Sequence, residues 1–284
     1  MSTIHTRKMH CSFGFNQTEI TMITKTAQHY FLRSACLLTY LLFNIACDDH
    51  QTEPEPDTFP IPTANDRLLL GSTFAFGLGN AAYNKEKMPE KFQFTDLGQD
   101  VVINYTPAAA VYVISEGGQI KNKLIYTLKN GVAQSRIDYE VGPNGKESVI
   151  GTVTYIYKAG KLHKTLTMQN GQVAGSREYY YDNANENVIM MEDYDKDGVL
   201  TVKITFEYTN ILDKSGSFNE WNVNMDGTLF PRKSNYLVKK KIIDFGSFVQ
   251  EANMSYVLDL QGYVISGEEA TPSVGTYTWT NKWM

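Results

Sequence analysis

Residues 200–208 read Leu200-Thr201-Val202-Lys203-Ile204-Thr205-Phe206-Glu207-Tyr208, with apolar and polar side chains in strict alternation. An alternation of period two, carried by β-branched and aromatic residues, is typical of a strand with one buried face. We therefore predict a central antiparallel strand that buries the face of Leu200, Val202, Ile204, Phe206 and Tyr208. The opposite face, which includes Lys203, is expected in solvent.

The same alternation recurs on both sides of this strand. In 136–141 it predicts inward positions for Ile137, Tyr139 and Val141, and in 254–260 for Met254, Tyr256, Leu258 and Leu260. Asp100–Tyr105 and Ala108–Ser115 read as two further strands, whereas 68–83 fits either a helix or an apolar strand interrupted by glycine. Because helical spacing is nowhere sustained after residue 63, the fold class is all-β.

Turn dipeptides separate these strands, among them Asn130-Gly131, Asn170-Gly171 and Asp197-Gly198. Asn-Gly and Asp-Gly favour the two-residue turns that join antiparallel neighbours. We predict an up-and-down meander of repeated hairpins that forms a large curved sheet or a sandwich. The all-β domain is assigned to residues 64–284, with 64–120 as its N-terminal part and 121–284 as its hairpin-repeat part.

An apolar stretch over 37–46 ends at Ala46 and is followed by Cys47, with Lys25 and Arg33 upstream. It is shorter than the roughly 20 residues of a membrane-spanning helix and fits a signal peptide. The pattern resembles a bacterial lipoprotein signal, although Asn44 stands where an aliphatic residue is usual. The resemblance implies that 1–46 are removed and that Cys47 is acylated and anchored in a lipid bilayer. An uncleaved signal anchor and a plain secretory signal are the alternatives.

Acidic and proline residues dominate 47–63 after the cysteine. Such a run resembles the surface-export signal of Bacteroidota lipoproteins, which implies an outer-membrane location and exposure at the cell surface. The composition also fits a solvated tether that does no more than hold the domain away from the membrane.

Tyrosine-rich strands that run into Asx-Gly turns, such as Tyr179-Tyr180-Tyr181-Asp182-Asn183, resemble the YD-type hairpin repeats of secreted bacterial proteins. From Leu124 to Trp283 the chain is similar to Bacteroidota lipoproteins with an uncharacterised YD-like domain. This resemblance implies the hairpin fold and the cell envelope, and it implies no activity.

The net charge and the cysteine content restrict the classes of partner and cofactor that the domain could bind. Residues 1–46 hold four basic residues and one acidic residue, so 22 basic and 30 acidic residues remain after their removal, a net charge of −8. That balance disfavours nucleic acid as a partner. Cys47 is the single cysteine left, so no disulfide and no cysteine-based metal site forms within the domain, and we predict no cofactor.

Asp193, Asp195 and Asp197 precede Gly198 with the spacing of the first half of a calcium-binding EF-hand loop. The second half is missing, because Ile204 stands where a bidentate glutamate is required. We keep the three aspartates as a weak metal candidate beside the simpler interpretation, an acidic hairpin turn.

His163 is the only histidine of the sequence after residue 63, which excludes a multi-histidine metal centre within 64–284. A glycosidase that uses two carboxylates remains an alternative, but the surrounding sequence does not distinguish any such pair from the other acidic residues. We therefore predict that the protein is not an enzyme.

The long segment Asp213–Asn235 carries Phe218, Trp221 and Phe230 among small polar residues. Exposed aromatic rings stack on sugars or anchor protein interfaces, which makes these three the candidate ligand-binding residues. Alternatively they fold back and cap the open end of the sheet.

Three functions follow from these observations. The first is a membrane-anchored, non-catalytic binding or interaction module outside the cytoplasm, with a glycan or a surface protein as its ligand. The second is a structural or envelope-assembly protein, including a lipid carrier, and the third is a glycosidase.

Overall fold

The computed structural model describes residues 67–73, 77–184, 186–216, 229–231 and 233–284. These residues form sixteen antiparallel strands that close into a barrel. The first eight strands are β1 (Leu69–Ser72), β2 (Leu78–Tyr83), β3 (Pro89–Phe94), β4 (Gln99–Thr106), β5 (Ala109–Glu116), β6 (Gln119–Lys129), β7 (Val132–Val141) and β8 (Glu147–Lys158). The others are β9 (Lys161–Gln169), β10 (Gln172–Tyr181), β11 (Val188–Tyr194), β12 (Leu200–Leu212), β13 (Tyr236–Asp244), β14 (Val249–Leu258), β15 (Val264–Thr271) and β16 (Gly275–Trp283).

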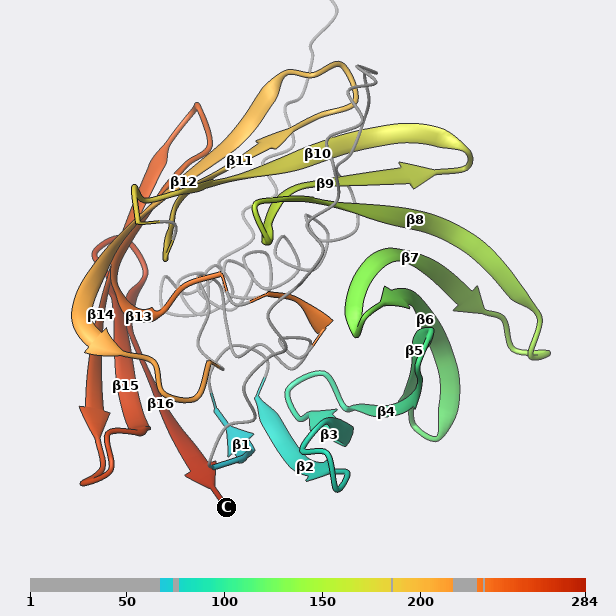
Figure 1. The fold of residues 1–284 in the computed structure, drawn as a ribbon, viewed down its shortest axis with the longest axis horizontal. Helices are drawn as coiled ribbons and strands as arrows, with labels where there is room; N and C mark the ends of the chain where they lie inside the picture. The colour runs from blue at the N-terminus through green and yellow to red at the C-terminus, as the bar shows by residue number, and fades with distance from the viewer. Residues whose placement is uncertain (1–66, 74–76, 185, 217–228, 232) are drawn as a thin grey trace, which may run out of the picture. The chain divides into compact units, whose positions relative to one another are not determined.

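Every strand pairs with its neighbours in the sequence, and β1 pairs in addition with β16. In Figure 1 the colours therefore follow one another around the wall, until the red β16 meets the blue β1. The up-and-down order was predicted correctly, but the expected open sheet or sandwich is wrong. The segment 68–83, which the sequence left undecided, contributes β1 and β2 and thereby supplies the strand that removes the free edge.

The hairpin turns follow the predicted chemistry. Asn130 and Gly131 have φ values of 52° and 77°, and Asn170 and Gly171 have 51° and 73°. Two successive residues with positive φ define a type I′ turn, whose twist matches that of the flanking strands. The dipeptides thus determine where the chain reverses and hold each strand against the next.

Strand β12 confirms the face predicted from the alternation. Val202, Ile204 and Phe206 are buried inside the barrel, while Lys203 and Glu207 on the other face reach solvent. Leu200 is exposed, because it begins the strand at an open end of the barrel. Burial of one face sets the register, since a slip of one residue would bring Lys203 into the core.

One predicted face is wrong, and a second prediction extends past the end of its strand. In 136–141 the buried side chains are Arg136 and Asp138, whereas Ile137, Tyr139 and Val141 are only half-buried. In 254–260, Met254, Tyr256 and Leu258 pack against the core as predicted, but Leu260 is fully exposed because β14 ends at Leu258 and the chain turns. Period two identifies which residues share a face, but it does not say which face is inside when two charged residues neutralise each other.

The interior is packed with aromatic and aliphatic side chains from nearly all of the strands. Several tyrosines combine a buried ring with a hydroxyl that donates to a backbone carbonyl of the wall, as Tyr157 does to Ala133 O at 2.5 Å and Tyr208 to Val188 O at 2.6 Å. Such bonds let a tyrosine contribute apolar area to the core without leaving its hydroxyl unsatisfied.

Strand direction defines two ends of the barrel. The end that receives the chain at Arg67 and releases it at Met284 is called the tether end; its connections are 84–88, 107–108, 130–131, 159–160, 182–187, 213–235 and 259–263. The opposite end is called the distal end; its connections are 73–77, 95–98, 117–118, 142–146, 170–171, 195–199, 245–248 and 272–274. The long segment 213–235 therefore leaves the wall and returns to it at the tether end.

Candidate functional site

Phe230, one of the three predicted ligand-binding residues, lies inside the barrel and is 9% exposed. Its ring meets the ring of Tyr155 edge-on at 4.9 Å and lies 6.3 Å from that of Tyr126. The preceding Leu229 is completely buried. The Phe230 ring is therefore part of the core, while Phe218 and Trp221 lie outside the described residues.

The three aspartates of the weak metal candidate do not converge. Asp193 is buried and accepts two hydrogen bonds from Arg177, at 2.6 and 2.7 Å. Asp195 Oδ1 accepts the backbone N–H groups of Asp197 and Val199, and the Asp197 carboxylate pairs with Lys196 at 3.3 Å. A carboxylate whose two oxygens accept hydrogen bonds from two nitrogens of a guanidinium is a poor metal ligand. Within the described ranges, no group of three or more metal-binding side chains is present.

Three ion pairs on the inner face are the polar feature that the sequence interpretation missed. Arg136 contacts Asp138 within β7, Arg177 contacts Asp193 across β10 and β11, and Lys241 Nζ lies 2.8 Å from Glu269 Oε1. Burying charges is costly unless each is paired and hydrogen-bonded. The sequence signal for such a pair was a basic and an acidic residue two positions apart on one strand, as at 136 and 138, because such residues share a face.

A hydrogen-bonded network covers the outer face of β9–β12. The Tyr180 hydroxyl oxygen lies 2.9 Å from both Glu178 Oε2 and Glu192 Oε2. Lys164 on β9 pairs with Glu178 on β10 at 3.0 Å, and Lys203 on β12 pairs with Glu192 on β11 at 3.6 Å, so the two lysines flank the two glutamates. The two glutamates face each other in the register, a repulsion that the phenol and the flanking lysines offset.

This network shifts the proton affinities of its members. Partial burial disfavours ionisation of Glu192, but hydrogen bonds from Tyr194 and Tyr180 and the charge of Lys203 outweigh it, so its pKa is lowered. Desolvation, followed by hydrogen bonds to Glu192 and Glu178, raises the pKa of Tyr180. At neutral pH the carboxylate of Glu192 is therefore charged and Tyr180 is neutral.

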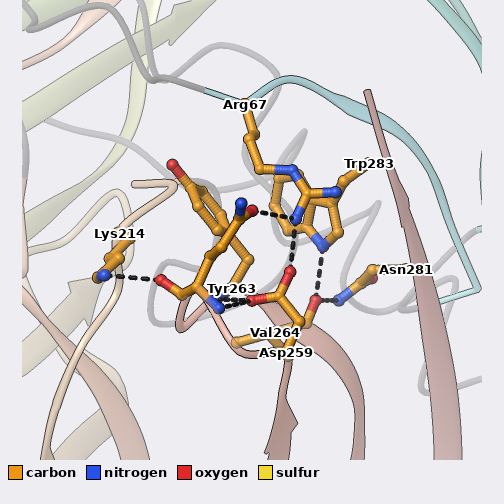
Figure 2. Close-up of polar contacts among 8 residues, drawn as sticks. Arg67, Lys214, Asp259, Tyr263, Val264, Asn281 and Trp283 are labelled. Carbon is orange, nitrogen blue, oxygen red and sulfur yellow. Dashed lines mark hydrogen bonds and ion pairs between the residues drawn. The ribbon is translucent and has the colours of Figure 1, made fainter.

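Figure 2 shows how the tether end is held together where the chain enters the barrel. Arg67 Nη1 donates to Asp259 Oδ2 at 2.5 Å and to Gln261 Oε1 at 3.1 Å, and its guanidinium carbon lies 5.2 Å from the centre of the Tyr263 ring. Lys214 Nζ donates to the backbone carbonyl of Gln261 at 2.6 Å. The contacts join the start of β1, the β12–β13 segment and the β14–β15 turn.

The last strand completes this corner. Trp283 Nε1 and Asn281 Nδ2 both donate to the carbonyl oxygen of Val264, at 2.8 and 2.9 Å. The ring of Trp283 also lies 5.4 Å from that of Tyr263. The corner therefore anchors both ends of the barrel-forming chain to the same turn.

The fold class is an up-and-down antiparallel β-barrel with an aromatic interior and charged residues on its outer wall. Two solved structures share the fold. A porin-like protein from Bacteroides uniformis ATCC 8492 is 15% identical, with a TM-score of 0.55 over 80% of this chain and 99% of its own. A porin-like protein from Bacteroides vulgatus ATCC 8482 is 12% identical, with a TM-score of 0.53 over 76% of this chain and 98% of its own.

At these identities the likeness concerns the fold alone. No protein-family model matches the sequence, and no curated protein matches it at a significant level. Among the residues that the structure describes, no helix is long and apolar enough to cross a membrane.

Proposed function

We propose that the protein is a lipid-anchored protein of the bacterial cell envelope, in which Cys47 carries the lipid and the barrel stands in water as a non-catalytic binding module. The anchor is inferred from the sequence around Cys47, and an outer-membrane location with exposure at the cell surface is inferred from the acidic run after it. The ligand class is a glycan or a protein.

The outer wall is the observation that carries the proposal. On this wall, ion pairs join neighbouring strands: Lys164 pairs with Glu178, Lys203 with Glu192, and Lys240 with Glu251. A barrel embedded in a bilayer presents an apolar band about 25 Å tall, and a lysine at mid-depth costs about 2–4 kcal/mol. Charges spread over β9–β14 favour a barrel surrounded by water, attached through a tether.

Membrane fractionation of a Cys47→Ala variant tests the proposal. We expect the wild-type protein in the membrane fraction and the variant in the soluble fraction, with an unchanged circular dichroism spectrum. Cys36→Ala is the matched control, because it removes a cysteine of the same segment and should leave the protein membrane-bound. A folded Cys47→Ala protein that still requires detergent for extraction would mean that the barrel itself is inserted in the bilayer.

A carrier of an apolar ligand is the second candidate, favoured by the aromatic inner face near the tether end, where Tyr126, Tyr155 and Phe230 pack together. Mass spectrometry of an organic extract from the purified protein tests this function. A lipid recovered in stoichiometric amount would favour the carrier over the binding module.

A further inference from the structure

Exposed large apolar side chains gather on one arc of the distal end. They lie in, or directly after, three connections that follow one another around the barrel, those between β11 and β12, β13 and β14, and β15 and β16. Their exposed fractions lie between 42 and 62%. The residues of this distal arc are Val199, Leu200, Phe248, Val249 and Val274.

The geometry of the turns does not require these residues. The β9–β10 connection at the same end is made by Asn170 and Gly171 alone, and the residue that follows is Gln172. In the β13–β14 turn, by contrast, the rings of Phe245 and Phe248 stack with centroids 4.5 Å apart and planes 20° apart. The stack fixes the Phe248 ring in an exposed position, where it is available for contact.

Carboxylates surround the arc. Asp195 and Asp244 accept backbone N–H groups of their own turns, so each is fixed next to the apolar side chains, and Asp197 is exposed. In the described distal connections and the one strand residue on each side of them, the lysines are Lys146 and Lys196. The carboxylates there are Asp96, Glu116, Glu147 and the three aspartates named above.

The opposite end has the reverse balance. The described part of the tether end carries Arg67, Lys85, Lys87, Lys129, Lys158, Lys161, Lys214 and Lys233 against Glu86, Asp182, Glu186, Asp213 and Asp259. Both ends of the barrel-forming chain lie there, and Met284 N donates to Leu68 O at 3.0 Å. A protein tethered through its N-terminal segment therefore has its distal end free to meet a partner.

We propose that the distal arc docks a cationic segment of another polypeptide, in which lysine or arginine alternates with large apolar residues. The apolar side chains would be covered by those of the partner, and its cations would pair with Asp195, Asp197 and Asp244. The assignment deepens the proposed function, because it gives the binding module a protein partner of defined chemistry. An anionic lipid surface or an acidic peptide has the wrong charge for this end.

The test uses the full native protein in nanodiscs of zwitterionic phosphatidylcholine and a fluorescent peptide in which Lys and Leu alternate. Fluorescence anisotropy should report saturable binding that weakens as salt is added. A peptide of alternating Glu and Leu should not bind, and one of alternating Lys and Ser should bind at least about tenfold more weakly. Empty nanodiscs give the background.

Variants locate the binding surface. Phe248→Ser combined with Val249→Ser should weaken binding by about tenfold or more, as should Val199→Ser combined with Val274→Ser, which leaves the phenylalanine stack intact. The matched control is Leu260→Ser combined with Met284→Ser, two exposed apolar residues of the tether end, and it should bind like the wild type. Thermal unfolding shows that each variant is folded.

Equal affinity for the Glu-Leu peptide, equal affinity for the Lys-Ser peptide, or loss of binding in the tether-end control would each overturn the proposal. So would unchanged binding in both distal double variants. Because the protein is presented in nanodiscs in every arm, failure here is distinct from failure of the Cys47 anchor, which fractionation measures.

Discussion

Arg136 and Asp138 lie two residues apart on β7 and meet inside the barrel, with Nε 2.6 Å from Oδ1 and Nη2 2.8 Å from Oδ2. Each side chain is 4% exposed. The guanidinium carbon also lies 5.7 Å from the centre of the Tyr126 ring. A charged pair is thus built into an aromatic interior, where each partner depends on the other.

Replacing one member of this pair should be severe. Asp138→Asn leaves the Arg136 charge buried without its counter-ion, and we expect a loss of about 3–5 kcal/mol in the free energy of unfolding, measured by urea denaturation. Glu147→Gln is the control, since it breaks the more exposed pair with Lys123 and should cost less than about 1 kcal/mol. Similar losses for the two variants would contradict the buried assignment.

Phe206→Ala should remove about 3–5 kcal/mol of stability, because the ring is buried in β12 and its loss leaves a cavity. Lys203→Ala on the opposite face of the same strand should change the unfolding free energy by less than about 0.5 kcal/mol. Denaturant melts compare the two, and equal effects would place the register one residue off.

Phe230→Ala should also destabilise the barrel, by about 3–5 kcal/mol, since its ring packs against Tyr155 in the interior. Urea denaturation of the wild type and the variant measures the loss in the free energy of unfolding. A stability equal to that of the wild type would return Phe230 to the ligand-binding candidates.

The Glu192 network should make stability depend on acid pH. Because the pKa of Glu192 is lowered from its ordinary value of 4.5, its ionised form stabilises the folded state above that pH. This contribution is lost as pH falls through the lowered folded value. Glu192→Gln lacks it, so the difference in unfolding free energy between wild type and variant should shrink as the buffer becomes more acidic. A difference that is constant with pH would contradict the network.

Tyr83, which links β2 to β1, should make the free energy of unfolding depend on alkaline pH. Desolvation raises the pKa of this tyrosine from 10.0 to about 12, and its hydroxyl donates a hydrogen bond to Leu69 O. A raised pKa favours the folded state below pH 10.0, and this contribution is lost as pH approaches about 12. Tyr83→Phe should therefore flatten the decline in unfolding free energy over this range, as followed by urea melts at increasing pH. An identical decline in both proteins would assign the alkaline transition to other groups.

The strand positions could be predicted because one face of each strand is buried and because Asn-Gly turns favour reversal. Burial of Val202, Ile204 and Phe206 follows from that pattern. Closure could not be predicted, because it depends on β1, a strand of four residues that pairs with β2 only through Ser72 and Leu78. So short a strand carries too little alternation to be recognised.

The inner ion pairs were missed for a different reason. The interpretation of 136–141 assumed that the apolar face is the inner one, whereas Arg136 and Asp138 neutralise each other and take that place. For Asp193 the calcium-like spacing was visible, but its partner Arg177 comes from a neighbouring strand. Cross-strand partners depend on the register, which the spacing within one strand does not contain.

The pairing of β1 with β16 has a consequence for how the chain folds. All the other pairings join strands that follow one another in the sequence, so each hairpin can form as soon as its two strands exist. The pairing of Leu69 with Trp283 must instead wait until β16 has been made, more than 200 residues after β1. Until then, β1 and the most recently formed strand remain open edges that another chain could pair with. The order of synthesis therefore makes closure of the wall the last event and the interval before it the period of greatest risk of aggregation.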